Sequence, residues 1–286
     1  MTDEPHDSGR VLTEPNPQTS LFGGLVKMWH DVWRYKYLIS NFVRRDLRIK
    51  YRNTALGYFW SLLEPLLLSS IYIVLFGIIA GRPERLYPLW VLIGVLMWRF
   101  FGASLSMAVS SLTNNEGTIG SIYFPRCLFG VAATTSQAAM VALNLLITIP
   151  FMIYYGIAPT VYLLMVPAGL LLLWMLALGL GMGLACLNVV NRDVTYLTEF
   201  VVRAGMYISP VLWTAEMGRK KWHAALDYLL LNPAAAPITM VRDGLTGVPV
   251  TLSTFLIVWS VTFCVLAFLI GLMIFQRYEA RVIKKL

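Results

Sequence analysis

Long uninterrupted apolar runs constrain this chain more than any other feature of its sequence. The stretch from Cys127 to Val190 contains no Asp, Glu, Lys, Arg or His, and the whole chain is 58% hydrophobic and only 13% charged. Soluble domains carry about 25% charged residues. Backbone polar groups inside a bilayer must be paired within the protein, so apolar runs of about 20 residues fold there as helices. We therefore predict an all-α integral membrane protein.

Six segments are predicted to cross the membrane. A crossing needs about 20 residues at 1.5 Å per residue, and five runs reach that length. The sixth is shorter and contains Arg203 and Pro210; we include it because omitting it would leave the two ends of the chain on opposite sides of the membrane. The predicted spans are residues 58–80, 86–110, 128–153, 161–190, 196–213 and 253–275.

The segment 222–246 is too polar to span once and too apolar for an open loop. Asn232-Pro233 divides it, and proline ends a helix because it lacks a backbone N–H. We predict an external half-inserted helical hairpin. A partly buried external loop is the alternative interpretation.

The basic residues indicate how the chain is oriented. With both termini in the cytoplasm, fifteen Lys and Arg lie on the inner side and six on the outer side, which agrees with the positive-inside rule. The net charge of +8 is therefore interpreted as contact with anionic lipid, because no nucleic-acid-binding module accompanies it. We predict a multi-pass protein with membrane contact and no nucleic-acid partner.

The N-terminal region is predicted to have two parts. Residues 1–26 are polar, contain three prolines, lack the apolar core of a secretory signal and are expected to be a disordered tail. Residues 27–56 alternate aromatic and basic side chains, which favours a cytoplasmic amphipathic helix in the membrane interface. Residues 57–286 form the transmembrane domain. The charged face of the interface helix comprises Arg44, Arg45, Asp46, Arg48, Lys50 and Arg52.

Metal and enzyme chemistry find little support in the sequence. The three cysteines lie far apart and beside apolar segments, and the three histidines show no ligand spacing, so no metal site is predicted. A membrane-embedded enzyme would be expected to cluster its carboxylates or carry a phosphate motif. The carboxylates are instead scattered from Asp31 to Glu199.

A series of short sequence blocks runs along the chain. They are Arg45-Asp46-Leu47, Lys50-Tyr51-Arg52, Leu56-Gly57-Tyr58-Phe59-Trp60, Glu64-Pro65-Leu66, Phe124-Pro125-Arg126, Asn191-Arg192-Asp193-Val194, Ser209-Pro210 and Leu231-Asn232-Pro233. This ordered set resembles the ABC-2 permeases that export bacterial polysaccharides such as O-antigen, capsule and teichoic acid, and the resemblance extends from about Asp31 to the C-terminus.

The resemblance implies an assembly and a substrate. Members of this family work as a homodimer with two copies of a separate ATPase subunit and move a lipid-linked glycan outward across the bacterial cytoplasmic membrane. The chain lacks the G-x-x-x-x-G-K-[ST] phosphate loop. We therefore expect no cofactor in this chain and place ATP and Mg on the partner subunit. An ABC-2 permease for a drug or a small lipid is the alternative, and a membrane enzyme is a weaker one.

Two cytoplasmic segments are predicted to couple and gate transport, chiefly by resemblance. In the first, Asn114, Asn115 and Glu116 can cap a short helix, while the exit toward span three is stiffened by Phe124, Pro125 and Arg126. In the second, Asp193 can cap the first turn of span five and Arg192 can reach headgroups or a partner carboxylate. An interfacial loop and a plain helix cap are the respective alternatives.

An aromatic conduit is predicted along span five. Tyr196, Phe200, Arg203 and Tyr207 recur at i, i+4, i+7 and i+11, which places them on one helical face. Sugar rings stack on aromatic side chains, and a charge at membrane depth avoids lipid. The alternative is that Glu199 pairs with Arg203 and the face only packs between helices. Further conduit candidates in span one are Tyr58, Trp60 and Tyr72.

Overall fold

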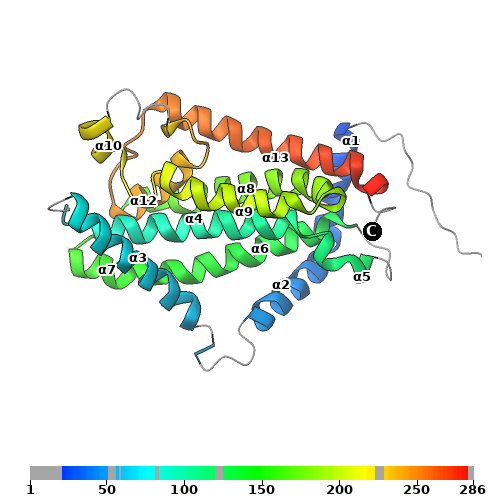
Figure 1. Cartoon of the computed structure of the whole chain (residues 1–286), viewed down its shortest axis with the longest axis horizontal. Coiled ribbons are helices and arrows are strands. Elements are labelled where there is room, and N and C mark those ends of the chain that lie inside the picture. Colours follow the sequence, from blue (N-terminus) through cyan, green and yellow to red (C-terminus); the bar gives the residue numbers. More distant parts are fainter. Residues whose placement is uncertain are drawn as a thin grey trace, which may run out of the picture.

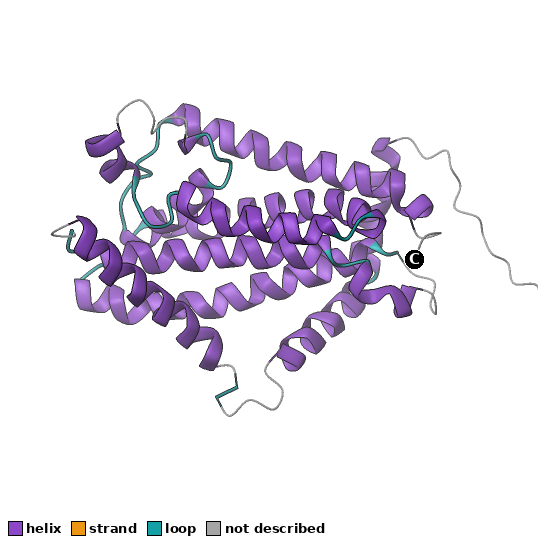
Figure 2. Ribbon diagram, viewed as in Figure 1, coloured by secondary structure: helices purple, strands orange, loops and turns teal. Residues whose placement is uncertain are grey.

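The regular elements of this chain are helices throughout the residues that its computed structural model describes, which are 21–50, 56–57, 59–80, 84–119, 125–222 and 229–282 (Figure 2). The α-helices are α1 (Leu21–Arg34), α2 (Lys36–Lys50), α3 (Phe59–Ala80), α4 (Tyr87–Val109), α5 (Glu116–Ile119), α6 (Cys127–Asn144), α7 (Thr148–Tyr155), α8 (Met165–Val190), α9 (Asp193–Ile208), α10 (Ala215–Trp222), α12 (Ala235–Thr246) and α13 (Thr254–Val282). Three short 3-10 helices are η1 (Thr113–Asn115), η2 (Leu145–Ile147) and η3 (Val161–Leu164).

The long helices form one bundle around α8. Helices α4, α6, α8, α9 and α13 run along the long axis of the molecule, and α3 crosses obliquely at one side (Figure 1). Helix α8 contacts α4, α12 and α13. One end of the bundle carries α1, α5 and the C-terminal end, while α7, α10 and α12 lie at the other end (Figure 1). These are the two ends that the charge pattern assigns to the cytoplasm and the exterior.

Four helical segments in the described part of the chain are long and apolar enough to cross a membrane. They cover Tyr87–Val109, Cys127–Tyr155, Val161–Val190 and Thr254–Glu279, and a shorter apolar helix covers Phe59–Leu75. The boundaries agree with the predicted spans 86–110, 128–153, 161–190 and 253–275 to within a few residues. The C-terminal helix continues to Val282, beyond the predicted end at residue 275.

Span five differs most from its prediction. The expected helix 196–213 is instead α9, which covers Asp193–Ile208 and ends before Pro210. Ser209 is extended, with φ −76° and ψ 155°, because the residue before a proline is disfavoured in helical geometry. Sixteen residues rise only about 24 Å. Helix α9 is therefore short for a spanning helix.

The N-terminal region also needs correction. Helix begins at Leu21, inside the predicted tail 1–26, and the single predicted helix 27–56 is two helices separated by a turn at Tyr35. Met28 of α1 is buried in an apolar cluster with Leu272 and Phe275 of α13. This packing holds α1 against α13. Residues 1–20 lie outside the described residues.

Close backbone packing joins α8 to α13. A Cβ added to Gly179 would collide with the Ala267 carbonyl oxygen and the Phe268 Cα, and one added to Gly271 would collide with the Gly179 carbonyl. Small residues permit helices to approach this closely in membranes. The G-x-x-x-G pair that begins at Gly179 therefore serves a contact within one chain.

The segment predicted as an external hairpin is helical after its proline. Helix α12 begins at Ala235, two residues after Pro233, and is almost wholly buried against α8, α4 and η3. Arg242 of this helix is one of the basic residues that the charge pattern assigns to the outer side, and its side chain is buried there, with 2% exposed. Its guanidinium donates to the carbonyl oxygens of Pro210, Val211 and Trp213. Residues 223–228 of the predicted hairpin lie outside the described residues.

Candidate transport and coupling sites

Helix α9 has an inner face that packs and an outer face that the chain leaves open. On the inner side, Trp98 of α4 donates its Nε1 proton to the Val202 carbonyl at 3.0 Å, and the Trp98 ring lies against Gly205. The outer face carries the predicted conduit residues, with exposed fractions of 72% for Tyr196, 66% for Phe200 and 60% for Tyr207, and 77% for the Arg203 side chain. The predicted spacing thus produces one continuous face.

The Arg203 guanidinium on this outer face forms an ion pair with Glu199, at 3.2 Å and with both side chains exposed. The pairing that the packing interpretation requires is therefore present, but the described helices leave most of this face exposed. Exposing charges to lipid is unfavourable even when they are paired. Contact with a second molecule or with an aqueous conduit would cost this ion pair less free energy than contact with hydrocarbon.

Span one brings one further conduit residue to α9. The Tyr72 side chain of α3 reaches that of Tyr207, and its hydroxyl lies 3.7 Å from the Met206 sulfur. Trp60 lies in the first turn of α3 with 43% of its surface exposed, away from this meeting point. Tyr58 lies outside the described residues. The structure therefore joins Tyr72 to the α9 face and leaves Trp60 separate.

A second polar group lies between α3, α4 and α6. Arg99 of α4 forms an ion pair with Glu64 of α3 at 2.7 Å. A small cavity of about 50 Å³ beside them is also lined by Gln137 and Asn144. Arg99 lies within the predicted span 86–110, but the sequence does not identify Glu64 as its partner, because the two residues belong to different helices.

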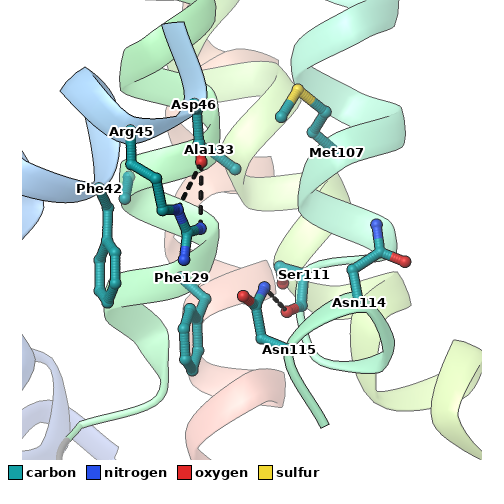
Figure 3. Close-up of a pocket in the computed structure, with 10 residues that line it drawn as sticks. Phe42, Arg45, Asp46, Met107, Ser111, Asn114, Asn115, Phe129 and Ala133 are labelled. Atoms are coloured by element: carbon teal, nitrogen blue, oxygen red, sulfur yellow. Dashed lines mark hydrogen bonds and ion pairs between the residues drawn. The ribbon is translucent and has the colours of Figure 1, made fainter. Parts of the chain in front are cut away.

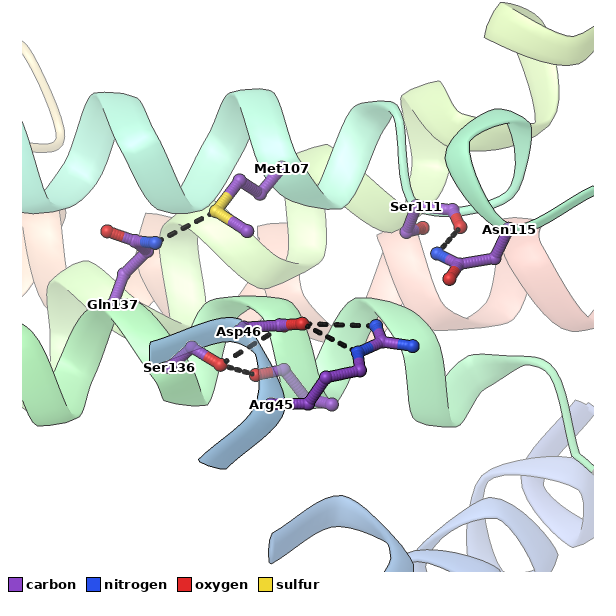
Figure 4. A network of polar contacts seen from close by, with 8 residues as sticks. Arg45, Asp46, Met107, Ser111, Asn115, Ser136 and Gln137 are labelled. Atoms are coloured by element: carbon purple, nitrogen blue, oxygen red, sulfur yellow. Dashed lines mark hydrogen bonds and ion pairs between the residues drawn. The ribbon is translucent and has the colours of Figure 1, made fainter. Parts of the chain in front are cut away.

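The interface helix α2 lies against α6 and forms one wall of a larger cavity. Arg45 forms an ion pair with its neighbour Asp46 at 3.0 Å, and its guanidinium lies 4.9 Å from the centre of the Phe42 ring. The second Asp46 oxygen is 3.5 Å from the Ser136 hydroxyl (Figure 4). Arg44 and Arg48 are exposed, whereas Arg52 and the side chain of Lys50 lie outside what the structure describes.

The cavity beside α2 has a volume of about 190 Å³ and opens where α2, α6 and the loop after α4 converge (Figure 3). Charged, amide and aromatic groups share its wall. The lining residues are Phe42, Arg45, Asp46, Met107, Ser111, Asn114, Asn115, Phe129, Ala132 and Ala133. Predicted residues of the interface helix and of the first coupling segment thus meet at one place.

The first coupling segment forms a different local structure from the one predicted. Asn114 and Asn115 do not cap a helix; they belong to η1, and the Asn115 amide donates to the Ser111 carbonyl at 2.9 Å. Glu116 begins the short helix α5. Pro125 precedes Arg126, which forms an ion pair with Glu279 of α13 at 3.4 Å. Phe124 lies outside the described residues.

The second coupling segment is the corner between α8 and α9. Asp193 does not cap α9 with its side chain; its backbone N–H donates to the Asn191 side-chain oxygen at 3.0 Å. Asn191 forms this local turn because its short side chain reaches the backbone two residues ahead. Arg192 and Asp193 are both exposed at the bundle end. Their charges are available to another molecule.

Known proteins share this sequence pattern. The chain matches the ABC-2 type transporter family over residues 37–245, which is well over half of its length. The chain belongs to the ABC-2 type transporter family. The predicted resemblance is thereby confirmed, and this ABC-2 chain is a multi-pass membrane protein of the permease kind.

Three relatives of this ABC-2 chain illustrate the similarity. An O-antigen export system permease protein RfbA from Myxococcus xanthus is 23% identical over 219 residues, which cover 75% of this chain and 82% of the relative. A protein of the same name from Klebsiella pneumoniae is 26% identical over 223 residues, covering 76% and 83%. The polysialic acid transport protein KpsM from Escherichia coli is 23% identical over 225 residues, covering 73% and 81%.

Proposed function

We propose that this chain is the transmembrane permease subunit of an ATP-driven exporter that carries a lipid-linked polysaccharide from the cytoplasm to the outer face of the membrane. The outer face of α9 carries this proposal, because three exposed aromatic rings and a guanidinium line one helix. Sugar rings stack on aromatic side chains, whereas a drug or a small lipid would need a hydrophobic surface. Relatives with printed roles in O-antigen export and polysialic acid transport support it.

The working assembly that we propose is a homodimer with two copies of a separate ATPase subunit. A second copy facing α9 would cover the exposed Glu199–Arg203 pair and complete a conduit between the two chains. ATP and Mg would be bound by the ATPase. Helices α3 and α9 would join the four long apolar segments to give six spans in the bacterial cytoplasmic membrane, with both termini in the cytoplasm.

The coupling parts of the proposal lie at the cytoplasmic end. The ATPase would contact the α8–α9 corner through Arg192 and Asp193, and the polar end of the lipid-linked substrate would approach the cavity beside α2. The mixed lining of that cavity offers donors, acceptors and aromatic surface to such a group. The Arg126–Glu279 ion pair would keep the loop exit attached to α13 during these movements.

The test compares cells that lack this chain with cells that carry it. We expect cells without the chain to accumulate lipid-linked polymer in the cytoplasm, and the restored chain to return the polymer to the cell surface. The purified chain without its ATPase should show no ATP hydrolysis. Unchanged surface polymer together with increased sensitivity to a drug would favour the drug-permease alternative.

A further inference from the structure

A single buried amide joins the two cytoplasmic segments that the sequence predicted separately. Asn188, in the last turn of α8, is 1% exposed. Its Nδ2 donates to the Val109 carbonyl at 3.2 Å and to the Thr113 hydroxyl at 3.4 Å. Its Oδ1 accepts a hydrogen bond from the Thr195 hydroxyl at 2.7 Å. Thr195 belongs to the first turn of α9, and Thr113 begins η1.

The neighbours of Asn188 fix the direction of these hydrogen bonds. The Val109 carbonyl can only accept, so the amide nitrogen faces it and the amide oxygen faces Thr195. The Thr113 hydroxyl accepts from Asn188 and donates onward to the Ser110 carbonyl at 3.1 Å. Each group therefore donates to the next: Thr195 to Asn188, Asn188 to Thr113, and Thr113 to the Ser110 carbonyl. Hydrogen bonds in such a chain polarise and strengthen one another.

The helices on either side make this chain of bonds sensitive to movement of α9. A Cβ at Gly181 of α8 would collide with Ala108 of α4, so α4 and α8 are in close contact just before the amide. Helix α9 meets that pair through a corner of two residues, 191 and 192. If the first turn of α9 moves, the hydrogen bond from the Thr195 hydroxyl to Asn188 breaks. The hydrogen bond from Asn188 to Thr113 then weakens as well.

We propose that Asn188 is a positioning residue that transmits displacement of the α8–α9 corner to the loop beginning at Thr113, and so to the cavity wall formed by Ser111, Asn114 and Asn115. The link rests on the proposed function only in that an ATPase supplies the displacement. The chemistry of the link belongs to this chain alone. It gives the permease a defined route by which a push at one cytoplasmic segment reaches the other.

The test removes single hydroxyl groups from the two ends of the link. Thr195→Val and Thr113→Val each keep the side-chain shape and remove one hydrogen-bonding group. Replacing Asn188 itself would remove all three of its hydrogen bonds at once, whereas each threonine variant removes a hydroxyl at one end of the link, so the threonine variants are the cleaner choice. Thr198→Val is the matched control, because the Thr198 hydroxyl donates only within its own helix, to the Val194 carbonyl at 2.7 Å.

In the permease–ATPase complex, we expect Thr195→Val and Thr113→Val each to reduce export about tenfold while ATP hydrolysis stays within about twofold of wild type. The double variant should be no worse than either single variant, because the chain of bonds is already broken. The control should match wild type. Export that falls only in proportion to the assembled complex, or double-variant losses that multiply, would overturn the proposal.

Amide hydrogen exchange separates this proposal from the function on which it rests. Adding a non-hydrolysable ATP analogue to the wild-type complex should change exchange in residues 113–119, and Thr195→Val should abolish that change. A nucleotide response that persists in Thr195→Val would overturn the link. A response that Thr195→Val abolishes, in a complex that exports no glycan, would keep the link and refute the polysaccharide function.

Discussion

Replacing Gly179 by alanine tests the close contact between α8 and α13, and Gly183 provides the control on the same helix. A Cβ at Gly179 would collide with backbone atoms of Ala267 and Phe268, whereas one at Gly183 would lie 3.5 Å from the Gly271 Cα, an ordinary contact. Alanine gains roughly 1 kcal/mol of helix propensity over glycine at either position. This gain cancels when the two variants are compared.

The difference between the two variants therefore reports the steric cost at Gly179. Overpacking costs about 1–3 kcal/mol, and the upper part of this range applies because backbone atoms cannot move aside as a flexible side chain can. We expect Gly179→Ala to be less stable than Gly183→Ala by about 2–3 kcal/mol. Gly183→Ala should equal or exceed wild type.

The measurement is the free energy of unfolding of the purified chain, obtained from denaturant titrations in detergent micelles. Helicity before the transition should be the same in both variants, so that only the α8–α13 contact differs. Equal unfolding free energies for the two variants would show that α8 and α13 do not meet backbone to backbone at Gly179.

Three further predictions concern the candidate sites. Tyr207→Ala should reduce export severalfold, since an aromatic contact is worth on the order of 1 kcal/mol, and leave the amount of assembled complex unchanged; loss of the complex would favour packing. Arg242→Leu should destabilise the chain by at least about 3 kcal/mol because it leaves three buried carbonyls unpaired. Arg242→Lys should be less severe, and the free energies of unfolding of the two variants test this order. Glu64→Arg and Arg99→Glu should each lower the free energy of unfolding, and the double exchange should restore it. A double variant no more stable than the single variants would show that the ion pair is unimportant.

The sequence predicted the elements that depend on local pattern. Apolar runs fixed four helices to within a few residues, and the i, i+4, i+7, i+11 spacing placed Tyr196, Phe200, Arg203 and Tyr207 on one face of α9. The predicted span 196–213 runs across Pro210, yet α9 ends at Ile208 and leaves residues 210–213 outside the helix. Those residues are buried in an irregular segment instead.

Tertiary structure alone decided which distant residues meet. Nothing in the sequence near Asn188 indicates that its amide bonds to both Thr113 and Thr195, and nothing near Arg242 indicates that its guanidinium would be buried. Helical periodicity specifies the face on which a residue lies, since it follows from 3.6 residues per turn. The partner of that face depends on how helices far apart in the chain pack, and this is why the pairing of Glu64 with Arg99 and of Gly179 with α13 emerged only from the fold.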